Sequence, residues 1–177
     1  MAMDVEIVAL SASPGVVSAL ADTLIETVAN GGSVSFMHPL APDVAATFWT
    51  RSLAAADADE RVVLGAYADG ELVGTVTLLL DCPPNQPHRG EIAKLMTRLA
   101  HRGRGVARTL MLEAERIAVE HGRTLLTLDT AEEDGAAGLY EGLGYQRAGL
   151  IPDYAFKPHG GLTGTILYFK RIGPAAT

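Results

Sequence analysis

Residues 91–120 read EIAKLMTRLAHRGRGVARTLMLEAERIAVE, and this stretch is the most informative part of the chain. Ile92, Lys94 and Met96 alternate with residues 91, 93, 95 and 97 along this stretch, which suits the two faces of a strand. From Val106 onward, apolar residues recur at helical spacing, and His121-Gly122 supplies a cation and a C′ glycine that end the helix. The sequence therefore predicts a strand, a short loop with glycines, and an amphipathic helix.

The loop between this strand and this helix has the composition of an anion site. Gly103 and Gly105 lack side chains, so a ligand can approach the backbone N–H groups at the positive end of the helix dipole. Four arginines and no acid fall between residues 98 and 108: Arg98, Arg102, Arg104 and Arg108. The nucleotide-cradling pattern G-x-x-x-x-G-K-[ST] is absent, and Arg108 replaces the third glycine of a dinucleotide pattern. We therefore predict a phosphate site of another kind.

Two further patterns indicate which kind of phosphate ligand this loop binds. Residues 102–107, R-G-R-G-V-A, fit R-x-x-G-x-A, which resembles the pyrophosphate-binding signature of the GNAT superfamily of acetyl-CoA-dependent N-acetyltransferases. Residues 136–145, A-A-G-L-Y-E-G-L-G-Y, resemble the A-x-x-L-Y-x-x-L-G-[FY] segment of the same superfamily. The resemblance covers roughly residues 61–171 in the correct order. Two positions depart from it: Leu99 replaces the usual proline, and Glu133 replaces an asparagine that contacts CoA in many members.

Several shorter stretches resemble one branch of the superfamily, the tabtoxin-resistance acetyltransferases. They include E-I-A-K-L-M from residue 91, L-L-T-L-D-T from residue 125 and P-D-Y from residue 152. The resemblance implies an amino-acid-like β-lactam toxin as acceptor, hence a role in resistance or detoxification, and a possible homodimer.

The remaining sequence predicts a mixed α/β sheet flanked by helices. Strands are expected near residues 5–10, 61–68, 72–80, 91–97, 125–130 and 166–170. Helices are expected near residues 16–30, 42–56 and 106–120, with a short one from about residue 135. Asp69-Gly70 is a strong hairpin signal, and after residue 91 helix and strand alternate to the end. The resemblance implies the acyl-CoA N-acyltransferase fold, in which the fourth and fifth strands, at Glu91 and Leu125, splay apart to admit the cofactor.

The resemblance also assigns the expected cofactor and catalytic residues. Acetyl-CoA is expected to contact Met96, Thr97, Arg102, Gly103, Arg104, Gly105, Val106, Ala107 and Arg108. Tyr140 occupies the superfamily position whose hydroxyl can protonate the departing thiolate; the alternative is a core tyrosine. Glu91 and Asp129 are the candidate bases for the amine, directly or through water; a solvent-facing strand residue and a loop cap are the alternatives. Phe36 and Met37 are candidate acceptor contacts, with core packing as the alternative.

Composition and charge exclude several classes of function for this chain. A chain of 177 residues with 48% hydrophobic and 20% charged side chains fits one folded domain, residues 1–177. Its net charge of −7 disfavours nucleic-acid binding, and no apolar run is long enough to span a membrane. The histidines lack metal-ligand spacing, so no metal is expected. A single cysteine, Cys82, and an acidic N-terminus without a signal-peptide pattern predict a cytoplasmic setting.

Two classes of function remain. The first is an acetyl-CoA-dependent N-acetyltransferase that acts on the primary amine of a small molecule, with a peptide N-terminus or lysine as the alternative acceptor. The second is a CoA-binding sensor without catalysis, because a fold does not fix a function. The presence of Tyr140, Glu91 and Asp129 together favours the enzyme, because a sensor needs only the phosphate loop.

Overall fold

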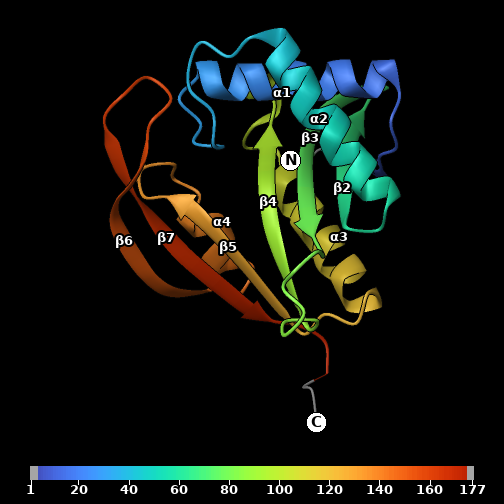
Figure 1. The fold of residues 1–177 in the computed structure, drawn as a ribbon, viewed down its shortest axis with the longest axis vertical. Coiled ribbons are helices and arrows are strands. Elements are labelled where there is room, and N and C mark those ends of the chain that lie inside the picture. The colour runs from blue at the N-terminus through green and yellow to red at the C-terminus, as the bar shows by residue number, and fades with distance from the viewer. Residues whose placement is uncertain (1–3, 175–177) are drawn as a thin grey trace.

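The computed structural model describes residues 4–174, which form a seven-stranded mixed sheet covered by helices on both faces (Figure 1). The strands are ordered β1-β2-β3-β4-β5-β7-β6. Their bounds are β1 Glu6–Ala9, β2 Arg61–Ala68, β3 Glu71–Leu79, β4 Arg89–Thr97, β5 Leu125–Ala131, β6 Gln146–Phe156 and β7 Leu162–Arg171. Only β4 and β5 pair in parallel, and every other neighbouring pair is antiparallel.

Four α-helices and one 3-10 turn complete the described chain. They are α1 Pro14–Ala29, α2 Pro42–Asp57, the 3-10 turn η1 Leu99–His101, α3 Val106–Glu120 and α4 Ala137–Gly142. Helices α1 and α2 both begin at a proline, whose fixed φ suits the first helical position. The Ser13 hydroxyl accepts the Val16 N–H at 3.3 Å and thereby caps α1.

The two faces of the sheet carry two hydrophobic clusters. Helix α3 buries its apolar stripe, including Leu110 and Met111, on one face, together with the interior side chains of β3 and β5. Helices α1 and α2 cover the other face, where Trp49 and Leu53 are fully buried. Burial of these side chains is the main source of the fold's stability, and the sheet is thereby held rigidly between two helical layers.

The contact between β4 and β5 is short. Parallel pairing runs only from Arg89 to Glu91 against Leu125 to Thr127, and beyond it the strands diverge (Figure 1). A Cβ on Gly90 would lie only 3.1 Å from the Leu126 side chain, so the absence of a side chain allows the close approach. Past this point β5 pairs with β7 instead, and the β5-facing edge of β4 from residue 92 to 97 is left without a strand partner.

Strand β4 also contains a bulge where it leaves β5. On the β3 side, Ala93 pairs with Thr77 and Met96 pairs with Thr75, so β4 has one extra residue here. Lys94 within the bulge adopts φ 53°, a left-handed conformation that is uncommon for a residue with a side chain. The bulge therefore interrupts the ladder to β3 beside the gap between β4 and β5.

The structure confirms the mixed α/β fold and the splay between β4 and β5. Strand 61–68 and helix 106–120 have the bounds that the sequence predicts. The expectation that helix and strand alternate to the end is wrong, because α4 is followed by two strands, β6 and β7, in an antiparallel hairpin. The sequence of β6, QRAGLIPDYAF, does not alternate regularly between apolar and polar residues and contains Pro152, so it gives no strand signal. In the structure eight of its eleven residues are exposed.

Candidate active site

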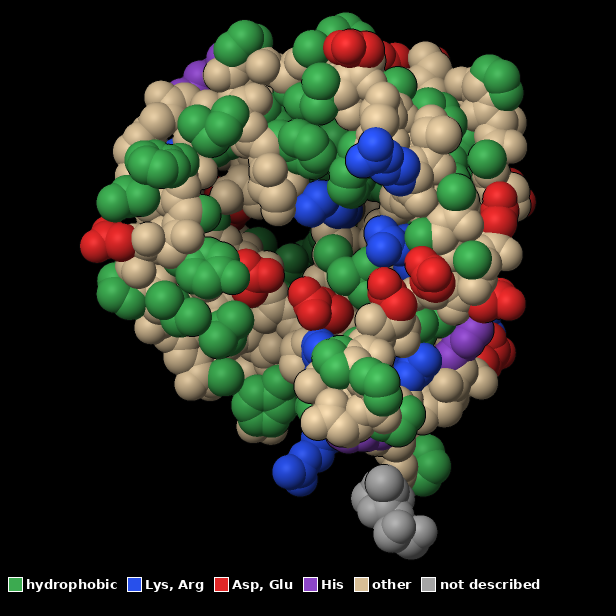
Figure 2. All heavy atoms as spheres, in the orientation of Figure 1, with side chains coloured by type: hydrophobic (Ala, Val, Ile, Leu, Met, Phe, Trp, Pro, Cys, Tyr) green, Lys and Arg blue, Asp and Glu red, His purple; other side chains and the backbone are tan. Residues whose placement is uncertain are grey.

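A cavity of about 870 Å³ occupies the gap between the diverging halves of β4 and β5. Figure 2 shows its mouth as a hollow between the β6–β7 hairpin and the α1–α2 side, with acidic and basic side chains at the rim. One part, here the helix end, is lined by eight residues of the stretch 97–108, which joins β4 to α3. The other part, here the hairpin end, is lined by Ser35, Lys94, Asp129 and Tyr154, which come from four separate segments.

The helix end is built mainly from backbone. Gly103 has φ 73°, and Gly105, the N-cap of α3, has φ 85°, conformations that glycine adopts without strain. The first in-helix bond of α3 runs from the Thr109 N–H to the Gly105 carbonyl at 3.0 Å, so the N–H groups of residues 106–108 have no acceptor within the helix. No acidic residue lies in the first turn of α3. This end of the cavity is suited to bind an anion.

Two buried polar atoms beside these N–H groups lack a protein partner. Within residues 4–174, Thr97 Oγ1 and His101 Nδ1 are buried and make no hydrogen bond, although both residues line the cavity. Buried polar atoms are rarely left without a partner, so this pair indicates a polar ligand. Arg102 donates through Nε to the Thr97 carbonyl at 3.2 Å, which fixes its guanidinium at the same end. These residues fit a phosphate-bearing ligand with a polar chain.

Most of the predicted cofactor residues lie together at the helix end. Arg102, Gly103, Gly105, Val106, Ala107 and Arg108 line the cavity, as do Met96 and Thr97 on β4. The side chain of Met96 is buried beneath α1 and α2, so it offers the cavity mainly its backbone. Arg104 does not line the cavity and is exposed. The structure therefore gathers the predicted set with the exception of Arg104.

Tyr140 projects from α4 into the cavity wall and is only 6% exposed. Its ring packs against Tyr145 and Tyr168, with ring centroids 6.0 and 5.7 Å away. Burial, with smaller contributions from the negative charges of Asp134 and Asp129, raises the pKa of Tyr140 to about 12. The hydroxyl therefore keeps its proton at neutral pH and can act as a proton donor.

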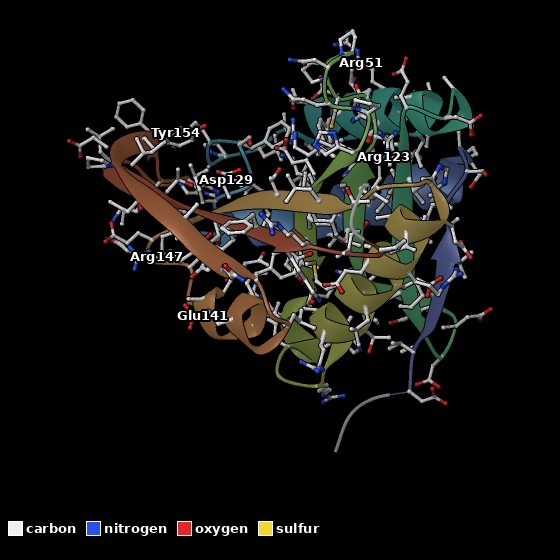
Figure 3. The ribbon with its side chains drawn as sticks, turned by 90° about the horizontal axis from the view of Figure 1, so that it is seen from below. Arg51, Arg123, Asp129, Glu141, Arg147 and Tyr154 are labelled. Carbon is white, nitrogen blue, oxygen red and sulfur yellow. The ribbon has the colours of Figure 1, made fainter. Side chains whose placement is uncertain are left out.

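The two predicted carboxylates occupy different surroundings. Asp129 lines the cavity and accepts a hydrogen bond from the Thr165 hydroxyl at 2.9 Å. Figure 3 shows Asp129 and Tyr154 on the same side of the β5–β7–β6 part of the sheet. Glu91 does not line the cavity: it lies where β4 still pairs with β5, and Arg89 Nη1 is 3.2 Å from its carboxylate. Asp129 is thus the better placed of the two to meet a ligand.

Lys94 is a cavity residue to which sequence reasoning assigned no role. Its ammonium donates to the Ser35 hydroxyl at 3.3 Å and lies 5.6 Å from the centre of the Phe48 ring. Burial lowers the pKa of Lys94, an effect opposed by Asp129 and Glu91 and reinforced by Arg61. No sequence pattern predicts the bulge that directs this side chain, because the bulge depends on the pairing of β3 with β4.

The predicted acceptor residues Phe36 and Met37 do not line the cavity. The Phe36 ring packs edge-on against Phe48, with centroids 5.2 Å apart, and Met37 is exposed on the α1–α2 loop. The cavity is lined instead by Ser35 on the same loop and by Tyr154 and Phe156 on β6. The side chains of Tyr154 and Phe156 are both more than half exposed. The P-D-Y stretch at residue 152 was a signal for Tyr154, although nothing in it placed the ring in a cavity.

Comparisons with known proteins agree with this geometry. Residues 33–145 match the model of a family described as the acetyltransferase (GNAT) family. Among curated proteins, N-acetyltransferase 8F1 of Rattus norvegicus is 31% identical over 86 residues, which cover 48% of this chain and 39% of that protein. The aligned part spans about two fifths of that relative's length.

Solved structures share the fold over almost the whole chain. A ribosomal-protein-alanine N-acetyltransferase from Brucella melitensis superposes with a TM-score of 0.81 at 21% identity, covering 94% of this chain and 99% of that one. The protein yncA of Salmonella typhimurium, solved with its cofactor acetyl-CoA, superposes with a TM-score of 0.78 at 15% identity, covering 98% and 97%. At these identities the likeness concerns the fold.

Proposed function

The chain belongs to the GNAT acetyltransferase family, and we propose that it transfers the acetyl group of acetyl-CoA to the primary amine of a small molecule. The observation that carries this proposal is that one cavity is lined by three kinds of functional group. Anion-binding backbone at the helix end, the protonated hydroxyl of Tyr140 and the carboxylate of Asp129 surround the same space. The first can hold the cofactor, and the other two can serve as the acid and the base that amide formation from a thioester requires.

The helix end supplies the groups that hold acetyl-CoA. Its pyrophosphate fits the N–H groups from Gly103 to Arg108, supported by the Arg102 guanidinium. The free edge of β4 from residue 92 to 97 offers backbone donors and acceptors to the amide groups of the pantetheine arm. Thr97 and His101, whose Oγ1 and Nδ1 atoms lack a partner among the described residues, line the same end of the cavity. When bound, acetyl-CoA supplies a thioester whose carbonyl carbon accepts the amine.

Asp129 and Tyr140 handle the two protons of the reaction. The acceptor is an ammonium at neutral pH, and it must lose a proton before its nitrogen can attack. Asp129 takes that proton, directly or through water; Glu91, at the closed end of the splay, is the alternative base. As the bond from nitrogen to the acetyl carbon forms, the bond from that carbon to sulfur breaks, and Tyr140 protonates the departing thiolate.

The bulge in β4 supplies the donor that this reaction needs at the carbonyl oxygen. Lys94 and Leu95 have no register partner on β3, and the edge of β4 that faces β5 is unpaired here as well. A backbone N–H in the bulge is therefore free to donate to an oxygen that gains negative charge. The donor is fixed in the strand and needs no reorganisation during the reaction.

The finer identity of the acceptor is also part of the proposal. The resemblance to the tabtoxin-resistance branch favours an amino-acid-like or β-lactam toxin, and a role in resistance. A peptide amine is the alternative acceptor, and a CoA-binding sensor without catalysis is the alternative function. A cytoplasmic location and a homodimer complete the proposal. In the described residues no helix is long and apolar enough to cross a membrane.

The proposal is tested by thiol release from acetyl-CoA in the presence of a panel of small amines, amino acids and short peptides. We expect release that depends on the protein and on one class of amine, with the acetylated amine detected by mass spectrometry. Tight binding of acetyl-CoA without release for any amine would favour the sensor. Release with peptides alone would favour the peptide acetyltransferase.

A further inference from the structure

Lys94 is a cation on the wall of the cavity that the reaction itself does not use. Within residues 4–174, no carboxylate lies within 4.0 Å of its ammonium, and its contacts are the Ser35 hydroxyl at 3.3 Å and the face of the Phe48 ring. A half-buried ammonium with one hydroxyl as its hydrogen-bond partner has donors to spare. It is therefore a site at which an anionic group of a ligand is stabilised.

Both residues of this contact, Lys94 and Ser35, have a strained backbone conformation. Lys94 adopts φ 53° and its partner Ser35 adopts φ 73°, although neither is a glycine. Two left-handed residues that contact each other cost conformational free energy, and such strain gathers at ligand-binding positions. The strain directs the Lys94 ammonium and the Ser35 hydroxyl to the same point of the cavity wall.

The anion that Lys94 meets is not a phosphate of CoA. The pyrophosphate is assigned to the helix end, where α3 begins, whereas Lys94 lies in the bulge of β4 at the hairpin end. The Phe48 and Ser35 contacts place the Lys94 side chain on the α1–α2 side of the sheet, opposite α3. The group that reaches Lys94 therefore arrives with the acceptor.

Asp129 supplies the opposite charge at the same end of the cavity. Burial lowers the pKa of Lys94 and the Asp129 carboxylate partly opposes that lowering, so the two groups, which line the same cavity, interact electrostatically without forming an ion pair. The aromatic rings of Tyr154 and Phe156, 56% and 63% exposed, line the cavity beside them. A cation, an anion and an apolar wall are together complementary to a zwitterion with an organic side chain.

We propose that Lys94, with Ser35, binds the carboxylate of an acceptor that is an amino acid, while Asp129 receives its ammonium group. This proposal rests on the proposed function and names the class of its acceptor. Lys94 Nζ donates to the carboxylate, and the Ser35 hydroxyl, which accepts from Lys94, donates its own proton to the second carboxylate oxygen. The side chain of the amino acid then lies against Tyr154 and Phe156.

The kinetic test uses matched pairs of acceptors: free amino acids, and the carboxamides of the same amino acids, which keep the amine and the side chain but lack the negative charge. We expect the wild-type protein to prefer the free amino acids by at least about tenfold in kcat/KM, the loss of one charge-assisted contact. Lys94→Met should bring the preference close to one, mainly through KM, and Lys94→Arg should restore part of it.

A control variant separates this role from a general effect of charge. Arg147→Met removes a cation from β6 on the α4 side of the sheet (Figure 3) and should leave the preference unchanged. Equal turnover of amino acids and carboxamides by the wild type, or a preference that survives Lys94→Met, would overturn the proposal.

A binding experiment tests this proposal separately from the proposed function. Calorimetric titration of free amino acids into the protein saturated with CoA measures carboxylate recognition without chemistry. Binding that weakens about tenfold or more in Lys94→Met supports the carboxylate site even if no amine is acetylated. Binding that is equal in the two proteins, or absent from the wild type, contradicts it. Acetyl-CoA affinity and thermal unfolding of each variant establish that the fold is intact.

Discussion

At its helix end the cavity is lined by one short stretch of sequence, between residues 97 and 108, mainly through its backbone, whereas at its hairpin end it is lined by side chains from four separate segments. The helix end uses N–H groups that any α-helix presents, together with glycines that let a ligand approach them. The hairpin end depends on Ser35, Lys94, Asp129 and Tyr154, which meet only because of the tertiary fold. The groups assigned to the cofactor are therefore specified by one local segment of sequence, whereas the groups assigned to the acceptor are brought together only by the tertiary fold.

We expect the largest effect from a change at Tyr140, which lines the cavity from α4. Replacing Tyr140 by Phe should lower kcat by about 10²- to 10⁴-fold, because the departing thiolate loses its proton donor. The affinity for acetyl-CoA should change little, because the lost interaction develops in the transition state. Since the pKa of Tyr140 is raised to about 12, wild-type kcat should lose the contribution of this hydroxyl only as the pH approaches 12.

Tyr145→Phe is the matched control for that variant. Tyr145 is also buried, its ring centroid is 6.0 Å from that of Tyr140, and it does not line the cavity. Its hydroxyl lies beside Glu115 of α3, and burial together with the Glu115 carboxylate raises the pKa of Tyr145. Neither residue lines the cavity, so removal of this hydroxyl should leave kcat nearly unchanged. Near-normal kcat in Tyr140→Phe, or equal losses in both variants, would make Tyr140 a packing residue.

The second largest effect concerns the binding of acetyl-CoA at the helix end of the cavity. Gly105→Val should raise the dissociation constant of acetyl-CoA by about a hundredfold, because a side chain at φ 85° distorts the start of α3 where the phosphates bind. Gly122→Val is the control: Gly122 has φ 71° just beyond the other end of α3, far from the cavity lining. Both variants should lose about 1–2 kcal/mol of stability. Unchanged acetyl-CoA affinity by calorimetry in Gly105→Val would remove the phosphate site from this loop.

The smallest of the three effects is expected from changes at the two carboxylates, Asp129 and Glu91. Asp129→Asn should lower kcat/KM by about ten- to a hundredfold and flatten the acidic limb of the pH–rate profile. Glu91→Gln should act in the same direction but less, because Glu91 pairs with Arg89 at the closed end of the splay. The measurement is the pH–rate profile of each variant. A larger loss in Glu91→Gln would assign the base to the closed end, and parent profiles in both would exclude both carboxylates.

The sequence predicts the helix end well because its signals are local. Gly103, Gly105 and the start of α3 belong to one motif, and the structure places them together around the cavity. Arg104 is the exception, because neighbouring arginines in a turn point in different directions and sequence spacing does not choose among them.

The hairpin end could not be predicted in the same way. Lys94 is directed by a bulge that arises from the register between β3 and β4. Tyr154 lies on a strand whose sequence shows no alternation, so the strand itself was missed. Phe36 has the chemistry of an acceptor contact, but Phe48 on α2 holds its ring away from the cavity. The extent of the chain as a single domain, residues 1–177, stays a prediction.

The decisive experiment is a crystal structure with CoA and a free amino acid. The proposed arrangement of the cavity predicts the pyrophosphate within hydrogen-bond distance, about 3 Å, of the N–H groups from Gly103 to Arg108. It also predicts the CoA sulfur beside Tyr140, the amino acid's carboxylate on Lys94 and its amine near Asp129. Pyrophosphate bound away from the start of α3, or an amino acid whose amine points away from the sulfur, would contradict it.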